Sequence, residues 1–184
     1  MKPEDLVALL SDGVPAGGGR WADLGAGDGA FTLALAELLG PGAEITAVDR
    51  DTGALRRLAA AMGKRFPSAS IETVGTDFTH PLHLSGLDGV VMANSLHFVR
   101  DKAPVLESVR GLLHPGGRLI VVEYSADRGN PWVPHPFSYS IWERLAAGAG
   151  FEGTRLLRTM PSRFLESLYS SVTHKPLASS AVTG

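Results

Sequence analysis

Acidic residues beside a glycine-rich turn give this sequence its clearest chemical signal. Asp23 and Leu24 lead into the segment GAGDG at residues 25–29, between a short apolar run and the apolar segment 30–39. Glycines let a backbone turn tightly and approach a ligand where a Cβ would clash. The start of the helix that follows offers free N–H groups and a partial positive charge. The turn therefore predicts a small-molecule site, although a tight strand–helix connection without a ligand is the alternative.

Two further acids follow the next two predicted strands. Asp49 ends the second strand, where a carboxylate can accept hydrogen bonds from both ribose hydroxyls of a nucleoside. Asp77, in the segment GTDF at 75–78, can accept from the exocyclic amino group of adenine, with Phe78 or its backbone against the ring. Turn or helix-capping roles are the alternatives for these acids. Together they predict a cofactor that contains a nucleoside.

A glycine turn with a ribose-binding acid fits either a dinucleotide or S-adenosylmethionine (SAM). Gly25, Gly27 and Ala30 match the dinucleotide pattern G-x-G-x-x-A. Asp23 favours SAM, because a carboxylate there can approach the ammonium of a methionine moiety but would repel a pyrophosphate. Asp28, at the start of the helix, disfavours a phosphate for the same reason. The sequence therefore favours SAM, and a nicotinamide-dependent oxidoreductase, using NAD(P), stays as an alternative.

Hydrophobic periodicity predicts the elements that position these residues. One predicted helix begins at Pro3, and four others cover 30–39, 52–66, 102–113 and 138–149. The predicted strands are 20–24, 45–48, 71–74, 88–93, 118–124, 154–159 and 164–172, with the turn HPGG at 114–117 before the fifth strand. This alternation indicates an α/β fold with a mostly parallel sheet, helices on both faces and one antiparallel strand near an edge. Ligands bind beyond the carboxyl ends of the strands in such sheets.

Length and composition narrow the class of protein. The chain has 184 residues and a net charge of −2, which argues against a broad nucleic-acid or membrane-surface footprint. Cysteine is absent, which excludes disulfides and thiol chemistry, and no two histidines share a helical face, so we predict no metal site. We expect a cytoplasmic protein with no secretory signal and no transmembrane helix. We expect one domain over 1–175, with an N-terminal helix and Gly-rich linker at 1–19, and a flexible tail at 176–184.

Six segments, in order, resemble the class I SAM-dependent methyltransferases. They are WADLGAGDGAF, ITAVDRD, VGTDF, LDGVVMANSLHFV, LLHPGGRLIVVEY and AGFEGTRLLRTMPSRF. The chain looks most like the small-molecule branch, the type 11 or ubiquinone/menaquinone-biosynthesis-like group. The resemblance implies a Rossmann-like sheet of seven strands in the order 3-2-1-4-5-7-6, the seventh antiparallel. It also implies methyl transfer from SAM to a small organic acceptor by in-line displacement, with S-adenosylhomocysteine as product.

The resemblance implies a set of cofactor contacts. Asp23 would lie near the amino group of SAM, Asp49 at the ribose hydroxyls and Asp77 at the adenine amino group. The full set is Asp23, Gly25, Ala26, Gly27, Gly29, Asp49, Arg50, Asp77, Phe78, Asn94, Ser95 and Leu96. The fourth strand ends in ANSL at 93–96 rather than in the Asn/Asp-Pro-Pro-Tyr/Phe of base amino-methyltransferases, which argues against a nucleic-acid acceptor.

Three residues are candidates for the base that removes a proton from an O–H or N–H acceptor. His97 follows the fourth strand, Tyr124 ends the fifth, and His135 lies in a loop that we expect to arch over the acceptor. Each also has a structural alternative, as a packing, strand-end or exposed loop residue. His114 is interpreted as a residue of the turn at the opposite edge of the sheet, with no role in the reaction. A catalytically silent SAM-binding regulatory or scaffold subunit is the alternative to an enzyme.

Aromatic residues after the fifth strand are candidates for a lid or acceptor wall. They are Trp132, Phe137, Tyr139 and Trp142, of which Phe137 and Trp142 fit a core position equally well. The chain has no inserted cap domain, so the site is expected to be open. An open site fits a bulky, extended or protein acceptor, or a homodimer in which the partner supplies the missing wall.

Overall fold

The computed structural model describes residues 1–162 and 165–178. The helices are α1 (Pro3–Leu10), α2 (Ala30–Leu39), α3 (Thr52–Arg65), the short 3-10 helix η1 (Leu96–Phe98), α4 (Ala103–Leu112) and α5 (Tyr139–Gly148). The strands are β1 (Gly19–Leu24), β2 (Ala43–Asp49), β3 (Ser70–Gly75), β4 (Leu87–Ala93), β5 (Leu113–Tyr124), β6 (Glu152–Pro161) and β7 (Ser167–His174). Within the described part of the chain, every helix is too short or too polar to cross a lipid bilayer.

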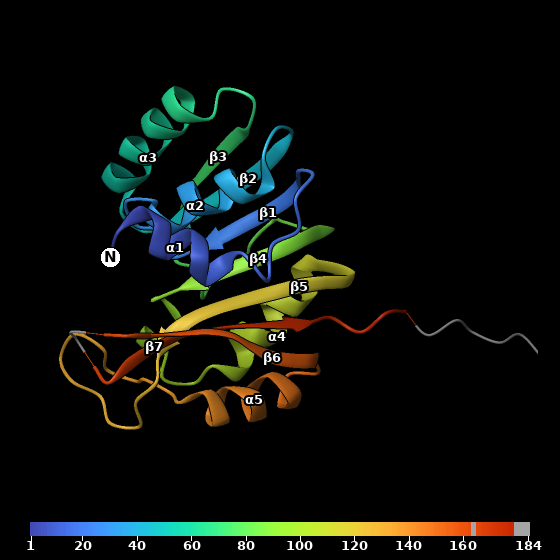
Figure 1. Cartoon of the computed structure of the whole chain (residues 1–184). Helices are drawn as coiled ribbons and strands as arrows, with labels where there is room; N and C mark the ends of the chain where they lie inside the picture. Colours follow the sequence, from blue (N-terminus) through green and yellow to red (C-terminus); the bar gives the residue numbers. More distant parts are fainter. Residues whose placement is uncertain (163–164, 179–184) are drawn as a thin grey trace, which may run out of the picture.

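The strands form one seven-stranded sheet in the order β3-β2-β1-β4-β5-β7-β6. The first five strands pair in parallel, and β7 runs antiparallel to both of its neighbours. Figure 1 shows this order running from β3 at the top of the view to β6 near the bottom. The predicted α/β class, strand order and antiparallel seventh strand are confirmed.

Apolar side chains that alternate along the strands form a core on each face of the sheet. On one face α1, α2 and α3 pack against residues such as Ile45, Val91 and Ile120. On the other face α4 and α5 pack against residues such as Val90 and Val121. Buried parallel strands with helices on both faces read as near-continuous apolar runs, as residues 89–93 of β4 and 119–122 of β5 do.

Local signals in the sequence explain where the helices around the site begin and end. Asp51 precedes α3, and its side chain accepts hydrogen bonds from the N–H groups of Gly53 and Ala54. Pro3 lies in the first turn of α1, where a missing N–H costs nothing. Gly40, with φ of 75°, ends α2. The helix boundaries therefore agree with the predicted ones to within a few residues.

The register of the strands brings the carboxyl ends of β1, β2 and β4 together. Leu24 pairs with Val48 across β1 and β2, and Asp23 pairs with Val91 across β1 and β4. The residues that come next in the chain, Gly25, Asp49 and Asn94, therefore leave the sheet at the same edge.

The start of β5 differs from the prediction. The HPGG segment at 114–117, predicted as a turn, lies inside β5, opposite a register shift between Leu87 and Gly89 of β4. Backbone hydrogen bonds explain this difference, because Gly116 N–H donates to the Lys175 carbonyl and Lys175 N–H donates to the Gly117 carbonyl. The predicted last strand began at Phe164, which lies outside the described residues, as do residues 179–184 of the predicted tail.

Candidate functional site

A cavity of about 340 Å³ opens at the carboxyl ends of β1, β2, β3 and β4. Its walls consist of Gly25, Asp49, Arg50, Thr76, Asp77, Phe78, Thr79, Asn94, Ser95, Phe98 and Val99. The structure thus brings together most of the predicted cofactor contacts. As far as the chain is described, the wall does not include Asp23, Ala26, Gly27, Gly29 and Leu96, which lie in the segments behind or beside it.

Hydrogen bonds join the glycine turn to Asp49. Gly27 N–H donates to Oδ2 of Asp49 at 2.8 Å, and Asp51 N–H donates to Oδ1 at 2.8 Å. The N–H groups of Gly25 and Ala26 both donate to the Val48 carbonyl. A carboxylate oxygen accepts more than one hydrogen bond, so Asp49 is oriented by the backbone and still offers acceptor positions to a ligand.

Gly25 and Gly29 share a left-handed backbone, with φ of 83° and 82°, but have different neighbours. A Cβ on Gly25 would overlap the Cβ of Ser95 in the cavity wall. A Cβ on Gly29 would overlap the side chain of Leu58 in α3. Gly25 therefore allows the segment after β4 to pack against the turn at the cavity wall, whereas Gly29 allows α2 and α3 to pack closely.

Asp77 and Arg50 form an ion pair across the wall of the cavity. Arg50 Nη1 lies 3.6 Å from Oδ2 of Asp77. The other carboxylate oxygen accepts hydrogen bonds from the N–H and the hydroxyl of Thr79, at 2.9 and 2.7 Å. These hydrogen bonds, with a smaller contribution from Arg50, hold the pKa of Asp77 below its usual value. Asp77 is therefore an ionised acceptor at neutral pH.

Asp23 is buried at the end of β1, with 1% of its surface exposed. The hydroxyl of Thr32 in α2 donates to its Oδ2 at 2.6 Å. Burial raises the pKa of Asp23 to about 6, the Thr32 hydrogen bond opposes the rise, and the Asp49 carboxylate adds to it. Thr32 donates to Oδ2 of Asp23 and not to Oδ1. A buried carboxylate with so few donors attracts a cationic group.

Asn94 follows β4 in a strained conformation. Its φ is 52°, and among the described residues it is the one residue other than glycine with a positive φ. Its side-chain Oδ1 is buried and has no hydrogen-bond partner in the described chain. The neighbouring Ser95 hydroxyl donates to the Leu24 carbonyl at 2.7 Å, which ties this segment to the end of β1. Asn94 thus presents an unsatisfied acceptor at the cavity wall, where strain of this kind is often functional.

His97 and Glu123 form a fully buried pair beside this segment. Oε2 of Glu123 lies 2.7 Å from Nδ1 of His97, and the Glu123 and His97 side chains are 0% and 3% exposed. Oε1 of Glu123 accepts hydrogen bonds from the N–H groups of Leu96 and His97, at 2.9 and 3.1 Å. An ionised Glu123 requires Nδ1 to carry the proton, which leaves the lone pair on Nε2. Nε2 makes no hydrogen bond within the described residues.

The other two candidate bases flank this pair. The Tyr124 ring lies 6.0 Å from the His97 ring, centroid to centroid, and burial raises the pKa of Tyr124, as does the Glu123 carboxylate. His135 contacts His97 through the backbone, because its N–H donates to the His97 carbonyl at 3.0 Å. Lys102 donates to the carbonyls of Val99 and His135, so it links η1 to the loop after β5.

Sequence reasoning missed Glu123 and Lys102. The signal for Glu123 was present, since an acid within the apolar strand LIVVEY must find buried donors. Lys102, 7% exposed, lies with its Nζ 4.8 Å from the centre of the Phe137 ring. Thr76, Thr79, Phe98 and Val99 of the cavity wall were also not predicted.

The aromatic lid candidates separate into two groups. Phe137 and Trp142 are core residues, 1% and 0% exposed, and Tyr139 packs beside them. Trp132 is 73% exposed in the loop after β5. In residues 1–162 and 165–178, no three His, Asp or Glu side chains gather where they could hold a metal ion.

The chain is similar in sequence to known methyltransferases. Residues 22–119, more than half of the chain, match the family described as a methyltransferase domain. An uncharacterized methyltransferase of Mycobacterium tuberculosis is 37% identical over 118 residues, covering 64% of this chain and 56% of that protein. The ubiquinone/menaquinone biosynthesis C-methyltransferase UbiE of Pasteurella multocida is 30% identical over 115 residues, covering 59% of this chain and 41% of that protein. This chain spans about half the length of the curated relatives it matches.

Solved structures share the fold at lower sequence identity. The YcgJ protein of Bacillus subtilis superimposes with a TM-score of 0.75 at 11% identity, over 95% of this chain and 100% of that one. At this level of identity the similarity concerns the fold alone.

Proposed function

The chain belongs to the class I SAM-dependent methyltransferase family, and we propose that it transfers a methyl group from SAM to a small organic acceptor by in-line displacement. The observation that carries the proposal is the 340 Å³ cavity, whose wall contains Asp49 and Asp77 together with Gly25 of the glycine turn. Its two acids and its glycine turn suit a nucleoside with a cationic substituent better than they suit a phosphate.

Three features of the cavity fit SAM. Oriented by Gly27, Asp49 retains acceptor positions for the ribose hydroxyls, and Asp77 is ionised and can accept from the adenine amino group. The buried Oδ1 of Asn94 lacks a partner in the described structure, and a ligand ammonium would satisfy it. The missing side chain of Gly25 lets its backbone lie against Ser95 in the cavity wall, where a ligand can approach it. Asp23, behind the turn, adds a negative charge toward the same cationic end of the ligand.

When bound, SAM supplies a methyl group already activated on a sulfonium. The protein then has to hold the acceptor in line, exclude water and receive the acceptor's proton. The segment after β4 is the part of the chain that can do this, since Asn94, Ser95, Phe98 and Val99 line the cavity. Between them lie Leu96 and His97, which are buried behind the wall and whose N–H groups are held by Glu123.

We assign the proton acceptor to His97. Glu123 binds Nδ1 and two backbone N–H groups of the same segment, so the imidazole is fixed in one orientation with the Nε2 lone pair free. Because His97 is buried, its proton transfer takes place out of contact with bulk water, where the Glu123 carboxylate stabilises the imidazolium that forms. Tyr124 is the alternative, but its raised pKa makes it a poor base at neutral pH.

A general base is needed when the acceptor atom loses a proton. The name of the relative UbiE specifies a C-methyltransferase, so carbon acids are the first acceptor class to test, ahead of phenols and amines. The wall offers Phe98, 58% exposed, as an apolar contact for a ring or chain.

The test is a panel of acceptors incubated with methyl-labelled SAM. A hydroquinone, a 1,3-dicarbonyl compound, a phenol and an amine of similar size cover the chemical classes. Label transfer to one of them, lost in His97→Gln, is the expected result. Transfer that persists at the original rate in His97→Gln would refute the base assignment, while protein that binds SAM and methylates no acceptor in the panel would favour the silent-subunit alternative.

A further inference from the structure

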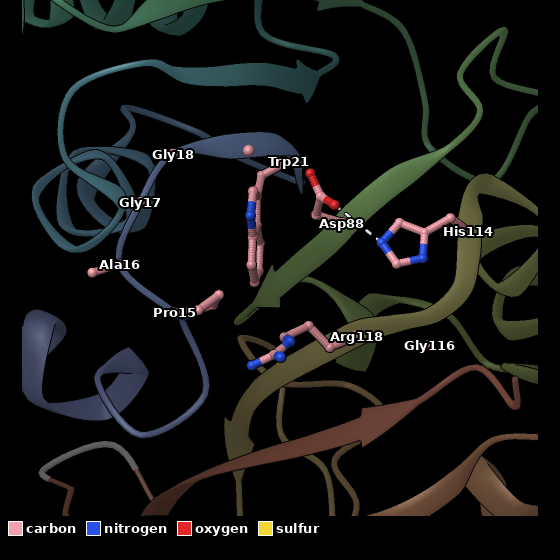
Figure 2. A pocket seen from close by; sticks show the side chains of 10 residues that line it. Pro15, Ala16, Gly17, Gly18, Trp21, Asp88, His114, Gly116 and Arg118 are labelled. Atoms are coloured by element: carbon pink, nitrogen blue, oxygen red, sulfur yellow. Dashed lines mark hydrogen bonds and ion pairs between the residues drawn. The ribbon is translucent and has the colours of Figure 1, made fainter.

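A second cavity, of about 290 Å³, lies at the other edge of the sheet. It is bounded by the amino ends of β1, β4 and β5 and by the glycine-rich segment before β1. Figure 2 shows the indole of Trp21, the Arg118 guanidinium and the paired side chains of Asp88 and His114 around one space. The first cavity lies at the carboxyl ends of β1 to β4 and shares no wall residue with this one, so the two sites are separate.

Trp21 supplies an unsatisfied donor to this cavity. The residue is 1% exposed, and its Nε1 has no hydrogen-bond partner among the residues that the structure describes. A Cβ on Gly89 would overlap the six-membered ring, so the missing side chain of Gly89 allows the indole to lie over β4. A buried N–H without an acceptor lowers the stability of the fold. An acceptor on a ligand would remove this cost.

Glycines keep the space beside this donor open. Gly17, Gly18 and Gly19 all have positive φ, of 111°, 80° and 109°. A Cβ on Gly19 would stand 3.4 Å from Nε1 of Trp21 and 2.9 Å from Oδ2 of Asp88. A side chain at this position would therefore crowd the indole N–H.

The wall of the cavity carries one guanidinium, that of Arg118, and one carboxylate, that of Asp88. Asp88 is already engaged, because its Oδ2 accepts from the Arg20 N–H at 2.7 Å and its Oδ1 lies 3.0 Å from Nε2 of His114. Arg118 uses one of its donors, Nη1, on the Gly13 carbonyl at 2.9 Å. A guanidinium has five N–H donors, so Arg118 retains others for a ligand.

We propose that this second cavity binds a small organic molecule through an oxyanion group, a carboxylate or a phosphate ester, which accepts hydrogen bonds from Trp21 Nε1 and Arg118. The volume limits the ligand to about the size of a single substituted ring. Pro15 and the Trp21 ring provide apolar contacts for such a ring. The site does not depend on methyl transfer, and its ligand does not compete with S-adenosylhomocysteine.

The indole N–H signals of nitrogen-15-labelled protein give a direct test. The chain has three tryptophans, and Trp21→Phe identifies the Trp21 signal. Trp142 is the internal reference, because its Nε1 donates to the Ser171 hydroxyl. Benzoate and phenyl phosphate are titrated in turn, with benzyl alcohol as the uncharged control. We expect at least one anion to shift the Trp21 signal with a Kd below about 10 mM. The anion that binds more tightly identifies the oxyanion.

Two arginine variants separate this site from general electrostatics. Arg118→Gln is expected to weaken anion binding at least ~10-fold, since the cation is lost. Arg155→Gln is the matched control, because Arg155 also donates to a carbonyl of the N-terminal segment, that of Asp12, but lies outside the cavity wall. No Trp21 shift with either anion up to about 50 mM, or an equal shift with benzyl alcohol, would overturn the proposal. Equal affinity in Arg118→Gln would do the same, and displacement by S-adenosylhomocysteine would assign the anion to the first cavity.

Discussion

Gly27 donates its backbone N–H to the Asp49 carboxylate at 2.8 Å, so the turn after β1 and the acid at the end of β2 form one unit. Substitution of Asp49 therefore affects both ligand binding and the conformation of the turn. Asp49→Asn keeps an oxygen that can accept from Gly27, whereas Asp49→Ala removes both functions. Comparison of these two variants separates the contribution of the carboxylate charge from that of the turn.

Asp23→Asn is expected to stabilise the free protein at high pH and to weaken cofactor binding. The pKa of Asp23 is raised to about 6, so the folded protein binds this proton more tightly than the unfolded chain. The protonated carboxyl group contributes its full stability below the pKa that Asp23 has in the unfolded chain, and this contribution is lost as the pH rises through about 6. The ionised form then costs the fold up to about 3 kcal/mol, which the amide avoids. Its oxygen can still accept from Thr32.

Urea unfolding of wild type and Asp23→Asn at several pH values measures this effect. The variant should be more stable at pH 8, and the difference should shrink towards zero near pH 4.5. Affinity for S-adenosylhomocysteine should fall ~10-fold or more in the same variant. Equal stability at both pH values would contradict the assigned ionisation of Asp23.

Gly25→Ala is expected to destabilise the fold and to abolish cofactor binding, because the new Cβ would overlap Ser95 in the cavity wall. Gly40→Ala is the matched control. Gly40 has a φ of 75° and a ψ of −158°, and a Cβ at this position would have no described atom within 4 Å, so the substitution brings backbone strain alone, about 1–3 kcal/mol. Chemical denaturation and a binding titration on both variants test the prediction. Retained binding in Gly25→Ala would show that the ligand does not approach this residue.

Much of the fold was predictable because the hydrophobic pattern indicates alternating helices and strands. The register between paired strands then follows, because the apolar side chains of each strand need a buried face. The start of β5 was not predictable from local signals, since Pro115 and the adjacent glycines are typical of a turn. The backbone groups of Gly116 and Gly117 pair instead with Lys175, which is 58 or more residues away in sequence. Local sequence does not record such long-range pairing.

For the site, the acids and the glycine turn were predictable because each follows a strand that ends at one edge. Glu123 was not identified, because its role depends on donors from the segment after β4 that reach it only in the folded sheet. Gly29 looks the same as Gly25 in sequence, and only the packing of Leu58 distinguishes the two positions.

Glu123→Gln is expected to reduce methyl transfer about 10²–10⁴-fold while leaving S-adenosylhomocysteine affinity within a factor of about three. The amide no longer stabilises an imidazolium at His97, but its oxygen can still accept from the backbone of the same segment. Tyr124→Phe is the control, because it keeps the ring beside His97 and removes only the hydroxyl. The initial rate with the acceptor found in the panel is the measurement. A rate equal to that of wild type would exclude a role for the buried pair in catalysis.

Lys102→Met is expected to destabilise the protein by about 1–3 kcal/mol. The variant keeps an apolar stem against Phe137 but leaves the carbonyls of Val99 and His135 without their donor. Thermal unfolding and limited proteolysis of the loop at 125–138 report the change. A Tm and a cleavage rate equal to those of wild type would show that Lys102 does not hold this loop.

The central claim, that the first cavity binds SAM, is tested most directly by calorimetric titration of S-adenosylhomocysteine into the protein, with NADH as competitor. We expect a Kd of about 1–100 μM for wild type, no effect of NADH, weaker binding by Asp49→Asn, and no measurable binding by a folded Asp49→Ala. Absence of binding to wild type, or displacement by NADH, would contradict the claim. Displacement by NADH would favour the alternative that the glycine turn belongs to a dinucleotide-binding site.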